Sequence, residues 1–188
     1  MPFTLSHPAA VVPFARSRLV LSALVMGSMT PDFPYFLCLS TRCHFGHTLP
    51  GLFLFCIPAG LIALWLFHKI LKRPLLSLLP VTHQPCLLPF AKDFRFAPWP
   101  QILLIVLSLL VGAFTHIAWD SFTHRDGWMV QQIPVLSQSL LATTQGTLKV
   151  YKVLQHGSTL FGAVVLYFWY LKWLKRAPRP MITPTVQW

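Results

Sequence analysis

Histidines and aspartates gather in short stretches whose residue types and spacing could bind a metal ion. His116 and Asp120 are four residues apart at the end of a long apolar run, and His44 and His47 are three apart just before another run. On a helix, residues i and i+4 project from one side about one turn apart, so His116 and Asp120 could share one ion. Neutral imidazoles and carboxylates suit zinc, manganese or iron, and histidine-rich ligation favours zinc. We therefore expect a divalent metal.

Carboxylates are scarce in this chain, which makes each one informative. The sequence holds only 4 acidic residues, all aspartates, against 15 Lys and Arg, with a formal net charge of +11. Asp93 lies beside Lys92 and Arg95 and is interpreted as a solvated loop charge. Asp126 precedes a glycine and is interpreted as a turn former. Asp32 and Asp120 are therefore the two carboxylates that we consider for a functional site.

The composition is typical of a membrane protein. In a chain of 188 residues, which suits one domain, 55% are hydrophobic, and the mean hydropathy is +0.61. Such values lie outside the usual range of soluble proteins. The basic residues fall in short clusters beside apolar segments rather than along one polar face. We therefore expect membrane lipid as a partner and no nucleic acid.

Three apolar runs are long enough to predict membrane-spanning helices. The third has a shorter apolar core and ends in an aromatic belt with basic anchors. The predicted fold class is an all-α, polytopic helical membrane protein of a single domain, with about three spanning helices and an N-terminal helical hairpin. Its parts are a hairpin at 1–30, spans at 51–68, 102–119 and 158–175, a loop at 69–100 and a loop at 120–157.

The N-terminal region does not read as one straight span, because the Arg-Ser-Arg stretch at 16–18 lies in its middle. A charge at the centre of a bilayer costs about 2.5–3.5 kcal/mol even on insertion scales. We expect two short helices, roughly 8–15 and 19–29, that fold back and return His7 and Asp32 to one face. A cleaved signal peptide is the alternative, but no A-x-A site follows the apolar stretch.

Loop charges predict the orientation. The loop at 69–100 and the C-terminal tail are rich in cations, namely Lys69, Lys72, Arg73, Lys92, Arg95, Lys172, Lys175, Arg176 and Arg179. The opposite side carries few, namely Arg42, Arg125, Lys149 and Lys152. By the positive-inside rule the first side is cytoplasmic and the second external, in a multi-pass protein of the inner or plasma membrane. Cys38 and Cys43 are close enough in sequence to pair if their loop faces an oxidising compartment.

This topology brings the polar groups to the external face from several separate segments. For a single histidine near a membrane boundary, a hydrogen bond to backbone is the commoner role, but a whole set on one face favours a site. We expect this set to contain metal ligands. His7, His124 and His156 would lie beside them as further ligands or hydrogen-bond partners. Arg125 and Lys149 are candidates for holding a substrate phosphate. His68 and His83 fall on the cytoplasmic side and receive no role.

Several motifs resemble known families. The stretches "MPFTLSHPAAVVPF", "GSMTPDFPYF", "GHTLPGLFLF", "THIAWDSFTHRDGW" and "YKVLQHGSTLFG" together resemble a bacterial family of small integral membrane proteins of unknown function, over nearly the whole chain. More distantly, "GSMTPD", "HFGHT" and "HIAWD" are similar to inner-membrane, metal-dependent hydrolase-like proteins, which are in turn compared with zinc-dependent phospholipase C and single-strand nucleases.

The distant resemblance implies a ligand set, with His7 as the match to an early histidine of that family. The matching ligand positions are Asp32, His44, His47, His116 and Asp120. The second motif departs from the family pattern, because it lacks the arginine after its first histidine and is one residue shorter. The chain also has no glutamate to match the glutamate ligand of the phospholipase C group. One or two metals are therefore expected rather than three.

Two classes of function compete. In a membrane-embedded hydrolase, Asp32 or Asp120 would orient a metal-activated water that attacks a phosphoester of a lipid or envelope-linked substrate at the headgroup level. In a metal-ion or proton transporter, the same groups would pass an ion. Polar groups at one face, rather than in the middle of the spans, favour the hydrolase. A non-enzymatic envelope protein is the third alternative.

Overall fold

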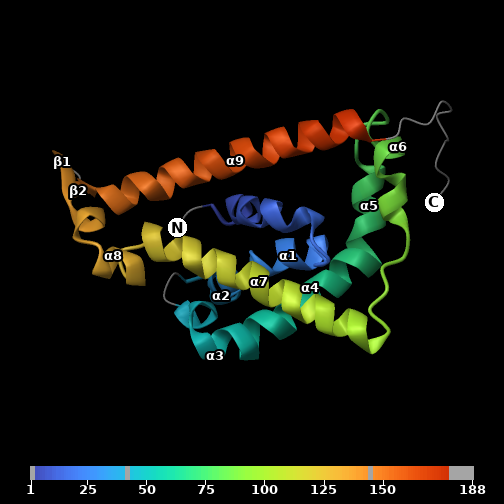
Figure 1. Cartoon of the computed structure of the whole chain (residues 1–188), viewed down its shortest axis with the longest axis horizontal. Helices are drawn as coiled ribbons and strands as arrows, with labels where there is room; N and C mark the ends of the chain where they lie inside the picture. The colour runs from blue at the N-terminus through green and yellow to red at the C-terminus, as the bar shows by residue number, and fades with distance from the viewer. Residues whose placement is uncertain (1–2, 41–42, 144–145, 178–188) are drawn as a thin grey trace.

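The computed structural model describes residues 3–40, 43–143 and 146–177, and it is mostly helical (Figure 1). Two long helices, α7 (Trp99–Thr123) and α9 (Val150–Arg176), run in opposite directions along the molecule. The N-terminal helices lie between them and contact both. The predicted helical class is therefore right in its main feature.

The N-terminal region folds back on itself. A 3-10 helix, η1 (Thr4–Arg16), is followed by a short α-helix, α1 (Leu21–Gly27), and the two contact each other. Pro8 and Pro13 lie inside η1, and a proline has no N–H with which to extend regular helical hydrogen bonding. The Arg-Ser-Arg stretch at 16–18 lies at the turn, so its charges stay out of the packed interior.

Three short elements follow the hairpin: η2 (Thr30–Asp32), α2 (Phe33–Cys38) and η3 (His44–His47). A disulfide bond joins Cys38 to Cys43 and ties the end of α2 to the start of η3. The sulfur of Cys43 is therefore engaged in a disulfide rather than free to act as a metal ligand.

A long helical stretch from Leu49 to Ser77 contains two wide, π-helical turns. Each wide turn precedes a proline, Pro58 or Pro74, whose missing N–H interrupts the regular hydrogen-bond ladder. Helical structure continues past the predicted span at 51–68, through the basic residues that follow. The parts are α3 (Leu49–Gly51), η4 (Leu52–Cys56), α4 (Ile57–Leu66), η5 (Phe67–Leu71) and α5 (Lys72–Ser77).

The predicted loops contain further structure. The loop at 69–100 also holds α6 (Gln84–Leu87) and η6 (Leu88–Ala91). The loop at 120–157 holds α8 (Trp128–Gln132), η7 (Pro134–Ser137) and a two-stranded antiparallel sheet of β1 (Ser139–Thr143) and β2 (Gly146–Lys149). The all-α prediction missed this sheet. Strands of 5 and 4 residues are too short for an alternating pattern to stand out.

Two glycines allow α1 and α7 to pack backbone to backbone. A Cβ on Gly112 would overlap the carbonyl oxygen of Leu24, and a Cβ on Gly27 would overlap the carbonyl of Leu109. No side chain could turn away from such a contact, because the obstacle on each side is main chain. This close approach fixes the residues after α1 against the face of α7 that carries His116.

Two stretches of the described residues are long and apolar enough to cross a membrane, Leu49–Ser77 and Trp99–Gln132. The helix α9 is continuous through the predicted span at 158–175 but is not one of them. Its apolar middle is bounded by a polar first part with Gln155 and His156 and by a basic last turn. The third span therefore remains a prediction.

Candidate metal centre

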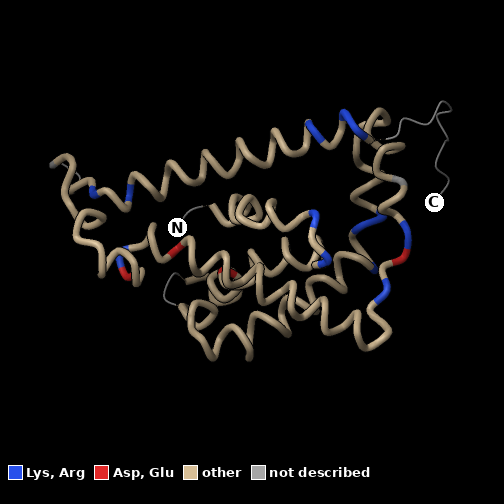
Figure 2. The backbone as a smooth tube through the Cα atoms, viewed as in Figure 1, with Lys and Arg blue, Asp and Glu red and all other residues tan. Residues whose placement is uncertain are grey.

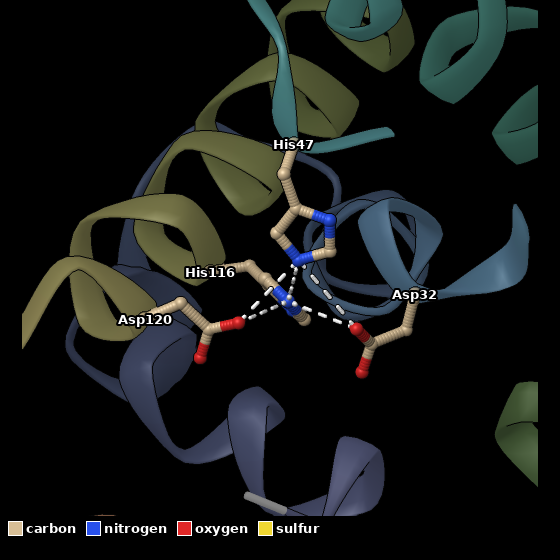
Figure 3. Close-up of side chains that lie close together, drawn as sticks. All are labelled: Asp32, His47, His116 and Asp120. Carbon is tan, nitrogen blue, oxygen red and sulfur yellow. Dashed lines mark hydrogen bonds and ion pairs between the residues drawn. The ribbon is translucent and has the colours of Figure 1, made fainter. Parts of the chain in front are cut away.

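Four side chains from three separate segments point toward one another (Figure 3). Asp32 ends η2, His47 ends η3, and His116 and Asp120 extend from one side of α7. Helical periodicity explains the last pair, because the two residues are one turn apart. The packing of the N-terminal hairpin on α7 brings in Asp32, and η3 brings in His47.

The four ligand atoms lie close enough together to hold one metal ion. Nε2 of His47 and Nε2 of His116 are 3.3 Å apart. Each nitrogen lies 3.3–3.6 Å from one oxygen of each aspartate, and all four atoms fall within 4.8 Å of one another. In a tetrahedral zinc site with bonds of about 2.0–2.1 Å, neighbouring ligand atoms are about 3.3–3.4 Å apart. A metal ion fits between these atoms with little movement.

Burial of the carboxylates supports the same fit. The side chains of Asp32 and His116 are 1% and 0% exposed, and that of Asp120 is 8% exposed. Among the described residues, Oδ1 of Asp32 has no hydrogen-bond partner. A buried oxygen without a partner carries a desolvation penalty that a bound cation would offset. The donor set therefore suits a divalent metal.

His116 is held in the tautomer that a metal ligand needs. Its Nδ1 lies 2.7 Å from the carbonyl oxygen of Ser28, and a carbonyl only accepts hydrogen bonds, so Nδ1 carries the proton. In a neutral ring, Nε2 then presents its lone pair to the cluster. Metal-binding histidines commonly donate their other N–H in this way.

Tyr35 makes the corresponding contact for the histidines of η3. Its hydroxyl lies 3.0 Å from Nδ1 of His44 and 3.5 Å from Nδ1 of His47. Burial, together with the charges of Asp32 and Asp120, raises the pKa of Tyr35 to about 12, so the phenol keeps its proton. His44 is exposed and stays outside the group of four, contrary to the expectation that it is a ligand.

The local fold of η3 separates the two histidines. A Cβ on Gly46 would overlap the carbonyl oxygen of Pro31, so η3 lies directly against η2. In this tight 3-10 turn His47 faces Asp32, whereas His44 faces Tyr35. A spacing of three residues therefore does not place both imidazoles on the same metal.

Thr4 makes a hydrogen bond to the carboxylate of Asp32. Its hydroxyl donates to Oδ2 of Asp32 over 2.6 Å. Burial by itself would raise the pKa of Asp32, but the neighbouring His116 and the hydrogen bond from Thr4 outweigh it and hold the pKa below its usual value. Asp32 is therefore charged at neutral pH. Sequence reasoning missed Thr4 and Tyr35, although both lie inside the quoted motifs "MPFTLSHPAAVVPF" and "GSMTPDFPYF".

His7 and His124 lie beside Oδ1 of Asp120, the oxygen that faces away from the group of four. Nε2 of His7 is 3.6 Å and Nδ1 of His124 is 3.4 Å from Oδ1 of Asp120. Burial, followed by the nearby His116, lowers the pKa of His7 to about 4, so this imidazole is neutral. Within the described chain, neither His7 Nε2 nor Asp120 Oδ1 has a hydrogen-bond partner. Both histidines thus lie beside Asp120, and their role as further ligands or hydrogen-bond partners stays a prediction.

A buried glutamine links the cluster to α9. Nε2 of Gln155 lies 3.5 Å from Nε2 of His124, and its Oε1 accepts a hydrogen bond from Nζ of Lys152 over 3.2 Å. Gln155 is 3% exposed and was not predicted, because an uncharged residue on an otherwise apolar helix gives no ligand signal. The next residue, His156, is exposed on α9 and is not part of the group of four.

The two predicted phosphate-binding cations do not belong to the group of four. Arg125 is exposed in the turn after α7, one residue beyond His124. Lys149 is half-buried at the end of β2. Their role in holding a phosphate remains a prediction. Arg42 and Arg179, which entered the charge comparison of the two sides, lie outside the described residues.

Comparison with known proteins places the chain by family. Searches of curated proteins and of solved structures found no match. A family profile described as a domain of unknown function, DUF4184, matches residues 1–188. Because the match covers the whole length, the chain belongs to the DUF4184 family.

Proposed function

We propose that this protein is a membrane-embedded, metal-dependent hydrolase that cleaves phosphoesters at the level of the lipid headgroups. The observation that carries the proposal is the close approach of two imidazole nitrogens and two carboxylate oxygens, from His47, His116, Asp32 and Asp120. The similarity of these motifs to hydrolase-like membrane proteins adds support for the reaction class.

Large apolar side chains on the surface support a membrane location. Leu54, Phe114 and Phe168 are 72%, 66% and 62% exposed on η4, α7 and α9. Soluble proteins rarely display contiguous apolar surface on several long helices. The exposure on α9 also supports the third span, because lipid would cover this face of the helix. We propose a multi-pass protein of the inner or plasma membrane.

The disulfide supports an external position for the metal centre. The bond between Cys38 and Cys43 lies in the same connection as His44 and His47. Disulfides persist in oxidising compartments and are rare in the cytosol. The basic loop at 69–100 lies on the other side and would face anionic cytoplasmic lipid. The centre then meets the headgroups of the outer leaflet.

The proposed site is buried at some of its ligands and partly exposed at others. His116 and Asp32 are buried, whereas the side chains of His47 and His124 are 18% and 28% exposed. Substrate would approach past these two histidines. A divalent metal bound there would lower the pKa of a water molecule and polarise a phosphoryl oxygen.

The chain's own residues supply the rest of the chemistry. Asp32 and Asp120 are held as charged acceptors that can orient the attacking water. Neutral His7 and partly exposed His124 lie beside Asp120 and can move a proton to or from the reacting group. Arg125 and Lys149 would contact the substrate phosphate from the open side.

The number of metal ions is part of the proposal. Oδ2 of Asp120 faces the group of four, and Oδ1 of the same carboxylate faces His7 and His124. These two histidines would therefore act either as further ligands or as hydrogen-bond partners of Asp120. Metal content per chain separates the two arrangements, with a value near one for the group of four alone.

The experiment measures metal content and the release of phosphate or phosphorylated headgroups by the detergent-purified full chain. The substrates are phospholipid extracts, and zinc or manganese is added after treatment with a chelator. We expect release that depends on metal and is lost in Asp120→Asn, because the amide keeps the size but removes the charge. Asp126→Asn is the matched control, since Asp126 is exposed beyond α7.

Three outcomes would contradict the proposal. One is a chain without bound metal, and another is full metal content with no release of phosphate or phosphorylated headgroup from any lipid fraction. The third is equal activity of Asp120→Asn and Asp126→Asn. Metal uptake into proteoliposomes without hydrolysis would favour the transporter instead.

A further inference from the structure

A cavity lies away from the candidate metal centre, between the end of α9 and the tip of the N-terminal hairpin. It has a volume of about 650 Å³ and is walled by η1, α1, α9 and the segment of α6 and η6. Small-molecule sites typically measure about 300–1,000 Å³. The cavity is therefore large enough for a lipid headgroup and part of an acyl chain.

Among the residues that the structure describes, three cations and no carboxylate line this cavity. They are Arg16, Lys172 and Arg176. The chain has only 4 acidic residues, and all are placed elsewhere. Asp32 and Asp120 are in the metal centre, Asp126 lies beyond α7, and Asp93 pairs with Arg73. None of the four aspartates therefore compensates the positive charge of the cavity.

Figure 2 shows the same distribution over the whole molecule, with Lys and Arg gathered near the ends of α9 and α5 and the tip of the N-terminal hairpin. The carboxylates of the metal centre lie along α7 and η2, in a different part of the fold. The cavity is therefore electrostatically separate from the metal centre and attracts an anion of its own.

The rest of the lining is apolar and aromatic. Trp169, Lys172, Trp173 and Arg176 are spaced at i, i+3, i+4 and i+7, so they share one face of α9. This face combines tryptophan rings with cations, the pairing found where a helix crosses the headgroup level. Apolar residues of η1 and α1, among them Leu21, form part of the opposite wall.

We propose that this cavity binds an anionic phospholipid. Arg16, Lys172 and Arg176 hold the phosphate, and an acyl chain lies against Trp169, Trp173 and Leu21. Inorganic phosphate would satisfy the cations but leave the apolar walls exposed to water. A zwitterionic lipid brings a cation of its own and offsets only part of the charge. An anionic lipid of the cytoplasmic leaflet matches both features.

The test uses tryptophan fluorescence of the purified full chain in detergent, because Trp169 and Trp173 line the cavity. Phosphatidylglycerol and phosphatidylcholine with the same brominated acyl chains are titrated in parallel, and inorganic phosphate is added as a competitor. We expect saturable quenching by phosphatidylglycerol at much lower concentration than by phosphatidylcholine. We also expect millimolar phosphate to leave the lipid bound.

Paired variants locate the site. A basic side chain near anionic lipid contributes about fivefold in binding, so Arg16→Gln with Arg176→Gln should weaken phosphatidylglycerol about 20- to 30-fold. Arg18→Gln with Lys175→Gln is the matched control, because both residues are neighbours that do not line the cavity. The single variant Lys172→Gln, at an exposed position, should weaken binding about fivefold and serves if the first pair does not fold.

Each contrary result overturns the inference in a different way. Equal affinity for the two lipids would mean that the cavity is only an apolar surface. Displacement of lipid by inorganic phosphate would mean that the cations bind a free anion. Equal weakening by the two variant pairs would mean that lipid responds to overall charge. Metal content is measured in the same samples and should not change, which keeps this test separate from that of the metal centre.

Discussion

The Nδ1 atom of His116 lies 2.7 Å from the carbonyl oxygen of Ser28. Ser28 follows directly after Gly27, and α1 and α7 pack with their backbones in contact at Gly27 and Gly112. The tautomer of a candidate ligand is therefore set by helix packing more than by its own neighbours on α7. Small changes at the helix crossing should reach the metal centre.

Gly112→Ala is expected to lower both stability and metal affinity. Its Cβ would overlap the Leu24 carbonyl and lie 2.7 Å from the backbone nitrogen of Ser28, so the two helices must separate. Overpacking of this kind costs about 1–3 kcal/mol. Thermal unfolding in detergent and a zinc titration would measure the two effects.

Gly157→Ala is the matched control for that change. Gly157 lies in α9, and a Cβ there would have no atom within 4 Å. Because alanine is favoured over glycine in a helix by about 1 kcal/mol, this variant should be as stable as the parent or more so. Equal unfolding temperatures for Gly112→Ala and Gly157→Ala would show that the close crossing is unimportant.

Tyr35→Phe should weaken zinc binding by about tenfold while leaving the fold intact, since loss of a group that orients a metal-bound histidine commonly costs 10–100-fold. The phenylalanine keeps the ring but cannot contact the Nδ1 atoms of His44 and His47. Competition with a chromogenic chelator gives the affinity. Tyr167→Phe, at a 59% exposed position, should bind zinc as the parent does. A Tyr35→Phe protein with unchanged affinity would remove Tyr35 from the site.

The stability of the metal-free protein should fall as the pH drops below about 6.5. The pKa of buried His7 is about 4 in the folded chain, against about 6.5 in an unfolded one. Between these values the unfolded state takes up a proton that the folded state does not. Stability then decreases toward low pH by at most about 1.4 kcal/mol per pH unit from this residue.

His7→Gln removes this contribution, so its stability should depend less on pH between 6.5 and 4 than that of the parent. Denaturant unfolding of chelator-treated protein at several pH values would measure the slopes. His156→Gln, at an exposed position on α9, should keep the parent slope. An identical dependence of stability on pH in all three proteins would mean that folding does not lower the pKa of His7.

Labelling of introduced cysteines tests the orientation. Ser77 and Ser137 are both exposed, and they lie on the predicted cytoplasmic and external sides. An impermeant reagent added outside intact cells should label Ser137→Cys and not Ser77→Cys. Native background is expected to be low, because Cys38 and Cys43 are bonded to each other and Cys56 and Cys86 are buried. The reverse pattern would invert the topology and place the metal centre in the cytoplasm.

Sequence periodicity was sufficient for the parts of the site that lie on one element. His116 and Asp120 follow from a spacing of four on a helix. Asp32 required the further inference that the N-terminal region folds back, which rested on the cost of burying the charges at 16–18. The choice between His44 and His47 was not accessible, because it depends on how tightly η3 packs against Pro31.

The same division applies to the fold. The apolar runs predicted the long helices, but the continuation to Ser77 past three cations shows that a cluster of charges does not mark the end of a helix. The two-stranded sheet depends on pairing between strands rather than on a pattern within either. Hydroxyl partners such as Thr4 and Tyr35 act through position alone, and their residue types carry no metal signal.

The candidate ligands come from residues that are far apart in the order of synthesis. Asp32 and His47 emerge early, whereas Asp120 completes the set only after α7 has been made. A metal ion can therefore be held by all four residues only when the N-terminal hairpin has docked on α7. Metal binding would then stabilise the assembled protein. It would add about 2.7 kcal/mol to the free energy of unfolding when free metal is at 100 times its dissociation constant.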